Sequence, residues 1–189
     1  MERVLLKEIA DVKLCIVSSS KKKECDEAVE WITLSSLLPF NGTGELLLSS
    51  EYYPDEDIKA EKHDIIMRRV APTGVNYIED DINAYVYNNL FIIRSKENVS
   101  ADYLAAYLDE NIEDFVKGLA RGSVAPSIGR KDLMEIEIDL PGEREQNAIG
   151  GYWRSYNAKK RLENKLTQLE QIKNREIFNI IRNKDGGKR

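Results

Sequence analysis

The side chains that could do chemistry are few, and they form no familiar catalytic pattern. The chain has one histidine, His63, with no cysteine or second histidine near it. A lone histidine before an apolar stretch is more often an exposed strand-edge residue than a base or a ligand. Pro54-Asp55 with Asp57-Ile58-Lys59 has a faint likeness to a nuclease metal site, but its two halves lie too close together. The residues therefore predict no catalytic and no metal site.

The sequence also lacks the signatures of a nucleic-acid methyltransferase. Such an enzyme would need a glycine-rich cofactor loop after a strand and a site of the Asn/Asp-Pro-Pro-Tyr/Phe type. Neither pattern is present. We therefore expect that the chain is not an independent enzyme and that it needs no cofactor of its own.

Basic residues in three segments are candidates for DNA contact. Residues 21–23 are lysines that follow three serines, a loop suited to gripping phosphates or simply a solvated charge run. Residues 68–76 pair arginines with an asparagine, types that read guanine and adenine, although an exposed strand end is as good an explanation. Residues 121–131 combine basic residues with glycines, and the glycines let the backbone approach a phosphate. The candidates are Lys21, Lys22, Lys23, Arg68, Arg69, Thr73, Asn76, Arg121, Ser123, Ser127, Arg130 and Lys131.

Charge is distributed unevenly along the chain. The formal net charge is −5, which taken whole would argue against DNA binding. Residues 152–189, however, contain eleven Lys and Arg against four Asp and Glu, whereas residues 24–62 contain ten acids against two bases. A chain this polarised can present a basic face, so the net charge is only weak evidence against nucleic-acid binding.

Length and composition predict one ordinary domain with an appendage. The 189 residues can bury a core, and no apolar run approaches the length of a membrane-spanning helix. The first residues lack the pattern of a secretion signal. Cys15 and Cys25 lie far apart in the sequence with no partner spacing, so we expect them to be reduced thiols of a cytoplasmic protein.

Hydrophobic periodicity predicts an α+β (mixed α/β) fold with a twisted, mostly antiparallel sheet and flanking helices. Ser100 is the expected cap of the first of two consecutive helices. A break at Ala71–Gly74 and a turn at Asn41–Gly44 separate strands. The expected strands are residues 14–17, 29–34, 46–48, 63–70, 75–78, 84–87, 90–94 and 136–140, and the expected helices are residues 5–12, 100–108, 110–120 and a short turn or helix at 131–134.

The last quarter of the chain predicts one long helix. After Pro141-Gly142, residues 143–183 contain no proline and only the glycines Gly150-Gly151, where a kink or a close helix approach is expected. At about 1.5 Å per residue this helix would span roughly 60 Å. Its apolar stripe predicts a seam for another helix, interrupted by Lys173 and Glu176; a helix folded back on its own domain is the alternative. The seam residues are Ile149, Trp153, Tyr156, Leu162, Leu166, Leu169, Ile172, Ile177 and Ile180.

The order of several short segments resembles a known family. The series runs Leu6–Val12, His63–Arg68 to Gly74, Asn88–Arg94, Ser100–Leu108, Gly122-Ser123, Ile128–Leu133, Ile136–Pro141 and Glu145–Ile149. It is similar to the target-recognition domain plus conserved helix of a type I restriction-modification specificity (S) subunit, over nearly the whole chain. Family members usually carry two such domains and two such helices, whereas this chain has one of each.

The resemblance implies a half-length, non-catalytic subunit that reads one DNA half-site. It implies a target-recognition domain at residues 1–141, a dimerisation and spacer helix at 142–183 and a disordered tail at 184–189. The implied partners are double-stranded DNA and methyltransferase (M) and restriction (R) subunits. From the apolar seam, and because two-fold pairing is the default for self-association, we also expect a second copy paired antiparallel through the coiled-coil helix. The alternatives are a non-reading coiled-coil adaptor, or truncated recombination cassette, of the same system and, less favoured, a nuclease.

Overall fold

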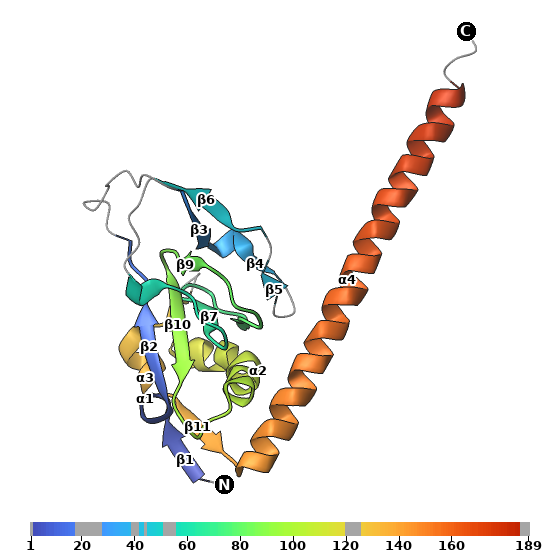
Figure 1. Cartoon of the computed structure of the whole chain (residues 1–189). Helices are drawn as coiled ribbons and strands as arrows, with labels where there is room; N and C mark the ends of the chain where they lie inside the picture. The colour runs from blue at the N-terminus through green and yellow to red at the C-terminus, as the bar shows by residue number, and fades with distance from the viewer. Residues whose placement is uncertain are drawn as a thin grey trace.

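The structure, a computed structural model, is a mixed α+β domain from which one long helix emerges (Figure 1). It describes residues 2–17, 28–38, 42–43, 45–50, 56–119 and 126–185. The elements are β1 (Glu2–Leu5), α1 (Leu6–Ile9), β2 (Ala10–Leu14), β3 (Val29–Ile32), the 3₁₀ turn η2 (Leu34–Ser36), β4 (Leu37–Leu38), β5 (Gly42–Thr43), β6 (Leu47–Ser49), the 3₁₀ turn η3 (Glu56–Ile58), β7 (Ile65–Arg68), β8 (Val75–Tyr77), β9 (Ala84–Val86), β10 (Leu90–Ser95), α2 (Ala101–Leu119), α3 (Arg130–Met134), β11 (Glu137–Leu140) and α4 (Glu143–Asp185).

A four-stranded antiparallel sheet, in the order β2-β10-β7-β8, is the centre of the domain. Alternate residues of its strands enter two separate cores. Phe91 and Ile93 of β10 pack with α2, α1 and α3 on one face. Leu90 and Ile92 of the same strand pack with Trp31 and Ile32 on the other face. Cover on both faces explains why β10 reads as one continuous apolar run.

Smaller sheets complete the domain. The second face of the central sheet is covered by β6-β3-β9, in which β3 and β9 are the one parallel pair of the described strands. β1 pairs antiparallel with β11, which brings the N-terminus beside the start of α4 (Figure 1). β4 and β5 form a short hairpin. The mostly antiparallel arrangement confirms the predicted fold class.

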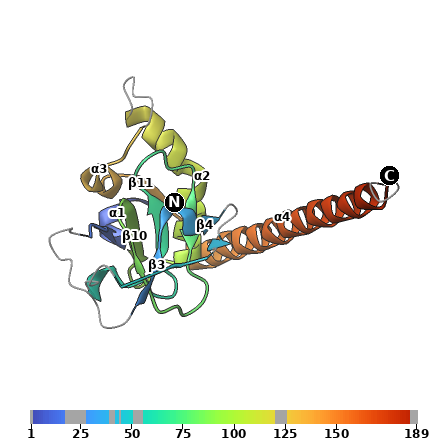
Figure 2. The same cartoon turned by 90° about the horizontal axis from the view of Figure 1, so that it is seen from above.

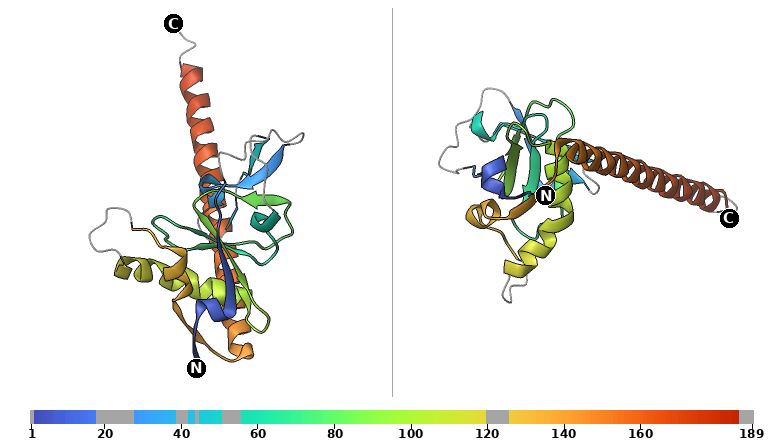
Figure 3. Two further views of the ribbon diagram at one scale, coloured as in Figure 1. Left: turned by 90° about the vertical axis from the view of Figure 1, so that its left-hand side faces the viewer. Right: turned by 90° about the horizontal axis from the view of Figure 1, so that it is seen from below.

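The helix α4 is a single uninterrupted helix of 43 residues. Its first third packs along α2, and the remainder leads away from the domain, as Figures 2 and 3 show from three further sides. Among the described helices, none is long and apolar enough to cross a membrane.

Two helix predictions are wrong in detail. Residues 5–12 were expected to be a helix, but only Leu6–Ile9 are helical, because Ala10–Leu14 pair with β10 as the edge strand β2. The two helices expected at 100–108 and 110–120 are one helix, α2, since nothing at Asp109 breaks the backbone. The strand expected at residues 14–17 is limited to Leu14, the end of β2.

Candidate nucleic-acid interface

Two of the predicted DNA-contacting segments lie side by side. Beyond the end of β7, Val70 forms an antiparallel bridge with Ser127. The Ala71 amide donates to the Pro126 carbonyl at 2.7 Å, and the Ile128 amide donates to the Arg69 carbonyl at 3.0 Å. Ala71 has a φ of 45°, the left-handed conformation of a tight turn. We call residues 68–71 and 126–131 the basic bridge.

Arg68 and Arg69 of the basic bridge use few of their hydrogen-bond donors within the domain. Arg68 Nη2 lies 3.5 Å from the Leu34 carbonyl, at the limit of a hydrogen bond. Arg69 Nε is buried and has no hydrogen-bond partner among the described residues. A buried donor without an acceptor is costly, so an acceptor brought by a ligand, such as the oxygen of a base edge, would stabilise this side chain.

Residues 126–131 of the basic bridge are anchored to the domain by buried side chains and a hydrogen bond. Ile128 and Leu133 are fully buried. Arg130 Nε donates to the Val12 carbonyl at 2.7 Å, while the residue as a whole remains exposed. Lys131 on α3 is exposed beside it. The anchoring holds the basic side chains of Arg130 and Lys131 at the surface on a fixed backbone. Phosphate contact requires this arrangement.

The other predicted DNA residues fall in different places. Thr73 is exposed after the turn at Ala71. Asn76 lies inside β8 opposite Ile66 and is only 8% exposed, so its amide is not on the surface with the arginines. Lys21, Lys22, Lys23, Arg121 and Ser123 lie outside the described residues. The geometry therefore brings together Arg68, Arg69, Ser127, Arg130 and Lys131.

The helix α4 has a domain-facing stripe at Gln146, Gly150, Trp153, Asn157 and Arg161, spaced four, three, four and four residues apart. A Cβ added to Gly150 would lie 2.5 Å from Asp102 Cβ, so the backbones of α4 and α2 approach closely here. This is the close approach that the glycine pair predicted, and the helix continues through it.

Polar contacts fix α4 along this stripe. Gln146 Oε1 accepts from the Ser100 amide at 2.9 Å, and its Nε2 donates to the Pro141 carbonyl at 2.9 Å. Trp153 Nε1 donates to Asp109 Oδ2 at 2.9 Å, and Arg161 Nη2 donates to Glu79 at 2.9 Å. The indole of Trp153, which the seam prediction turned outward, thus lies against its own domain.

The other predicted seam residues are exposed. Their exposed fractions run from 44% for Ile177 to 69% for Leu162. Tyr152, Phe178 and Ile181 add further exposed apolar area. The exposed seam residues are Ile149, Tyr156, Leu162, Leu166, Leu169, Ile172, Ile177 and Ile180. A soluble chain rarely leaves this much apolar surface uncovered on one helix, so α4 is suited to association.

The family comparison covers both the domain and the helix. A family model described as "Type I restriction modification DNA specificity domain" matches residues 1–182. The chain belongs to this family. A comparison of this chain with curated proteins found no match.

Solved structures share the fold of this specificity domain. The HsdS subunit from Thermoanaerobacter tengcongensis is 18% identical, with a TM-score of 0.59 over 90% of this chain and 39% of that one. The S subunit of M. genitalium is 18% identical, with a TM-score of 0.57 over 92% of this chain and 42% of that one. A chain from a structure on "complex assembly" and "conformational transition of the type I R-M system" is 20% identical, with a TM-score of 0.60 over 90% and 44%. The specificity domain spans about two fifths of each of these chains.

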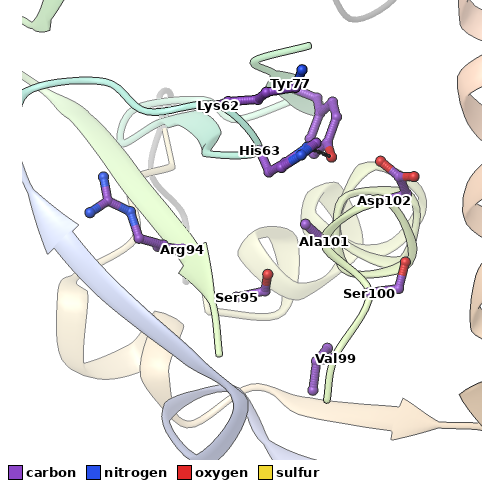
Figure 4. Close-up of a pocket in the computed structure, with 9 residues that line it drawn as sticks. All are labelled: Lys62, His63, Tyr77, Arg94, Ser95, Val99, Ser100, Ala101 and Asp102. Atoms are coloured by element: carbon purple, nitrogen blue, oxygen red, sulfur yellow. Dashed lines mark hydrogen bonds between the residues drawn. The ribbon is translucent and has the colours of Figure 1, made fainter. Parts of the chain in front are cut away.

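The lone histidine of the specificity domain lies in a polar pocket of about 420 Å³ at the start of α2 (Figure 4). His63 has a φ of 74°, and its Nδ1 lies 2.6 Å from the hydroxyl of Tyr77. Burial, with the nearby Asp102 carboxylate, raises the pKa of Tyr77, so the hydroxyl stays protonated as a donor. The described residues contain no group of three metal-ligating side chains. The contact between His63 and Tyr77 joins the turn before β7 to β8.

An ion pair between Arg94, which lines this pocket, and the buried Asp64 is structural. Asp64 is fully buried and accepts from Arg94 Nε and Nη2, each at 2.8 Å, and from the Glu61 amide at 2.7 Å. The bond to Asp64 raises the pKa of the Arg94 guanidinium. Figure 4 shows Arg94 turned away from His63 and Asp102. Its charge is therefore used inside the domain.

Sequence analysis did not identify the polar residues on the domain-facing side of α4 as contacts with the domain. Asn157 and Arg161 were not singled out, and Gln146 appeared only within the segment Glu145–Ile149, although all three recur at helical spacing with Gly150 and Trp153. That spacing is the one signal in the sequence that could have identified them. The domain partners of Gln146 and Arg161 are the Ser100 amide, just before α2, and Glu79, just after β8; both are distant in sequence and could not be named from it.

Proposed function

We propose that the chain acts as a specificity subunit of a type I restriction-modification system, with one target-recognition domain and one conserved helix. Its domain, residues 1–141, reads one short DNA half-site, and its helix sets the distance to a second reader. The subunit directs methyltransferase and restriction subunits to the DNA and catalyses neither reaction itself. The match of the family model to residues 1–182 is the observation that carries this proposal.

DNA contact is supported by the basic bridge. Arg68, Arg69 and Lys131 offer cationic donors on a backbone held by paired strands and buried anchors. Arginine forks can read a guanine edge in the major groove, and lysine neutralises phosphate. We assign phosphate contact to Arg130 and Lys131, and base contact to Arg68 and Arg69.

Association through α4 is supported by its exposed apolar seam. We propose a homodimer in which two α4 helices pair antiparallel about a two-fold axis, since a surface that pairs with itself closes with that symmetry. Two identical readers then face an inverted repeat with an unread spacer. The methyltransferase partner modifies adenine by base flipping and brings its own cofactor. The assembly works in the cytoplasm.

The reading role is tested by selecting bound duplexes from a random pool with the purified chain. Enrichment of one motif, lost in an Arg68→Ala/Arg69→Ala variant that keeps its unfolding temperature, is the expected result. A matched control is Arg144→Ala, which removes an exposed arginine on α4 that is not part of the basic bridge. Binding to random duplex as tight as to any selected sequence would refute the reading role and leave the adaptor interpretation.

The dimer is tested by light scattering coupled to size-exclusion chromatography. A mass of two chains at micromolar concentration is expected, with a shift to one chain when Leu166→Asp places a charge in the centre of the seam. A wild-type chain that stays monomeric throughout would remove the homodimer while leaving the reading role to be judged by the selection experiment.

A further inference from the structure

The basic bridge is a two-stranded ribbon that continues past the end of the central sheet. Val70 pairs antiparallel with Ser127, and backbone hydrogen bonds of 2.7 and 3.0 Å on either side of this pair hold the two strands together. The major groove of B-DNA is about 12 Å wide and admits a two-stranded ribbon of this kind. The basic bridge therefore has a shape that can approach base edges from within the groove.

One face of the ribbon is buried and the other is open. Ile128 is fully buried in the core that contains α2. Because side chains alternate along a strand, Ser127 lies on the opposite face from Ile128, and its cross-strand partner Val70 lies on the same face as Ser127. Val70 is 46% exposed, and Ser127 is exposed too. Alternation also places Arg68, two residues before Val70, on this open face, which we call the outer face.

A hydrogen-bonded turn restrains the end of the Arg68 side chain. Its Nη2 lies 3.5 Å from the carbonyl of Leu34, the first residue of η2. The fully buried Ser36 closes that turn, because its hydroxyl accepts from the Thr33 amide at 3.2 Å and donates to the Glu45 carbonyl at 2.9 Å. Leu34 itself is 47% exposed, so apolar surface adjoins the arginine. The domain thus sets where the guanidinium lies on the outer face.

Val70 has one chemically suitable partner in the major groove. An exposed valine on an ordinary protein surface needs no partner, but a valine on a ribbon inside the groove faces a base edge. All base edges there offer donors and acceptors, and only thymine adds an apolar group, its C5 methyl. A valine against a donor or acceptor would displace water without replacing its hydrogen bond, which is unfavourable. A valine against the methyl buries apolar area on both partners.

We infer that Val70 contacts the C5 methyl of a thymine close to the guanine that Arg68 reads, and so distinguishes thymine from cytosine. This inference deepens the proposed DNA-reading function and rests on it. The hydroxyl of Ser127 can donate or accept, so it adds a contact without selecting a base.

The spacing of the two side chains limits the spacing of the two bases. Residues two apart on a strand are separated by about 6.6 Å. Stacked base pairs are separated by about 3.4 Å. The half-site should therefore contain a guanine and a thymine, on the same strand or on opposite strands, at most two base-pair steps apart.

Base analogues in the duplex selected by the wild-type chain test this inference. Deoxyuridine lacks the C5 methyl of thymine and keeps its hydrogen-bonding groups, so replacing each thymine of the enriched motif in turn removes one methyl at a time. Fluorescence anisotropy at one salt concentration measures the affinity. At one thymine the affinity of the wild-type chain should fall about fourfold, the effect of one buried methyl group. The same replacement should have no effect on Val70→Ala, whose side chain is too short to reach the methyl.

A second analogue and a control variant complete the experiment. Replacing each guanine by 7-deazaguanine, which lacks the N7 acceptor, should weaken wild-type binding at one position and leave Arg68→Ala unaffected there. The matched control is Leu48→Ala, because Leu48 is 65% exposed on β6 and is not part of the basic bridge. This control should keep the fourfold loss with deoxyuridine. All three variants are compared at equal unfolding temperature with the wild-type chain.

Each outcome decides the inference. A sensitive thymine whose effect depends on Val70, within two steps of the guanine whose effect depends on Arg68, supports it. Deoxyuridine tolerated at every thymine, or an equal loss for wild type and Val70→Ala, would overturn it, as would a sensitive thymine more than two steps from that guanine. In those cases the enriched motif still supports the reading role. A chain that enriches no motif would refute the reading role and this inference together.

Discussion

Gly150 lies where the backbones of α4 and α2 touch, and replacing it should force the two helices apart. In Gly150→Ala the new Cβ would lie 2.5 Å from Asp102 Cβ, 2.8 Å from the Tyr103 amide nitrogen and 2.9 Å from the Asp102 carbonyl carbon. These atoms belong to the backbone of α2 or stand next to it, so no side-chain rotation relieves the clash. Either α2 or α4 must shift.

The neighbouring glycine is a matched control. A Cβ at Gly151 would meet nothing within 4 Å among the described residues. Alanine is favoured over glycine inside a helix by about 1 kcal/mol, so Gly151→Ala should raise the free energy of unfolding by up to that amount. Gly150→Ala receives the same helix-propensity gain but loses about 1–3 kcal/mol to overpacking. The two variants should therefore differ by roughly 1–3 kcal/mol.

Urea unfolding of both variants at one protein concentration measures this difference. The midpoint should fall for Gly150→Ala relative to Gly151→Ala, with an unchanged dependence on urea. If the two alanines stabilise the chain equally, α4 does not approach α2 closely at residue 150, and the described packing of the helix on the domain is wrong.

Three further predictions follow from single residues. Asp109→Ala should cost about 1–3 kcal/mol of unfolding free energy, because it leaves the Trp153 indole and the Val75 amide, which donate to Asp109 at 2.9 and 3.0 Å, without an acceptor; Asp114→Ala, exposed on the same helix, is the control in urea melts. Burial raises the pKa of the Cys15 thiol to about 12 from its ordinary 9.0, so its contribution to stability is present below pH 9 and is lost as the pH rises towards 12. The stability difference between wild type and Cys15→Ala should thus shrink by about 1.4 kcal/mol per pH unit above 9, and a constant difference would contradict the assignment. Lys131→Ala should reduce the slope of log affinity for DNA against log salt by about one, measured by fluorescence anisotropy, and an unchanged slope would show that Lys131 contacts no phosphate.

The sequence predicted the sheet better than the elements at its edge. The run Leu90–Arg94 indicated a strand covered on both faces, and Phe91 and Leu90 do enter opposite cores. Residues 5–12 fit a helical spacing, yet Ala10, Val12 and Leu14 also alternate as a strand does. Residues 10–14 become a strand because they pair with the open edge of β10. That pairing depends on the tertiary fold, so the local sequence pattern could not predict it.

The candidate interface was predictable as segments but not as an assembly. Nothing in the spacing of Arg69 and Ser127 indicates that their segments pair. Asn76 was expected at the surface because of its polar type, but β8 places it opposite Ile66, on the face of the central sheet away from α2, where it is buried. Trp153 fits an outward seam equally well as an inward anchor, and only its partner Asp109, distant in sequence, distinguishes the two.

The stripe from Gln146 to Arg161 has a consequence for chimaeras. A junction at Pro141, where the fold changes from strand to helix, would separate Ser100, Asp102 and Asp109 from the α4 side chains made to fit them. A foreign helix without a glycine at position 150 would collide with α2. The transplantable module therefore ends beyond Arg161, inside α4, and swaps made there should keep both the tilt of the domain and its thermal stability.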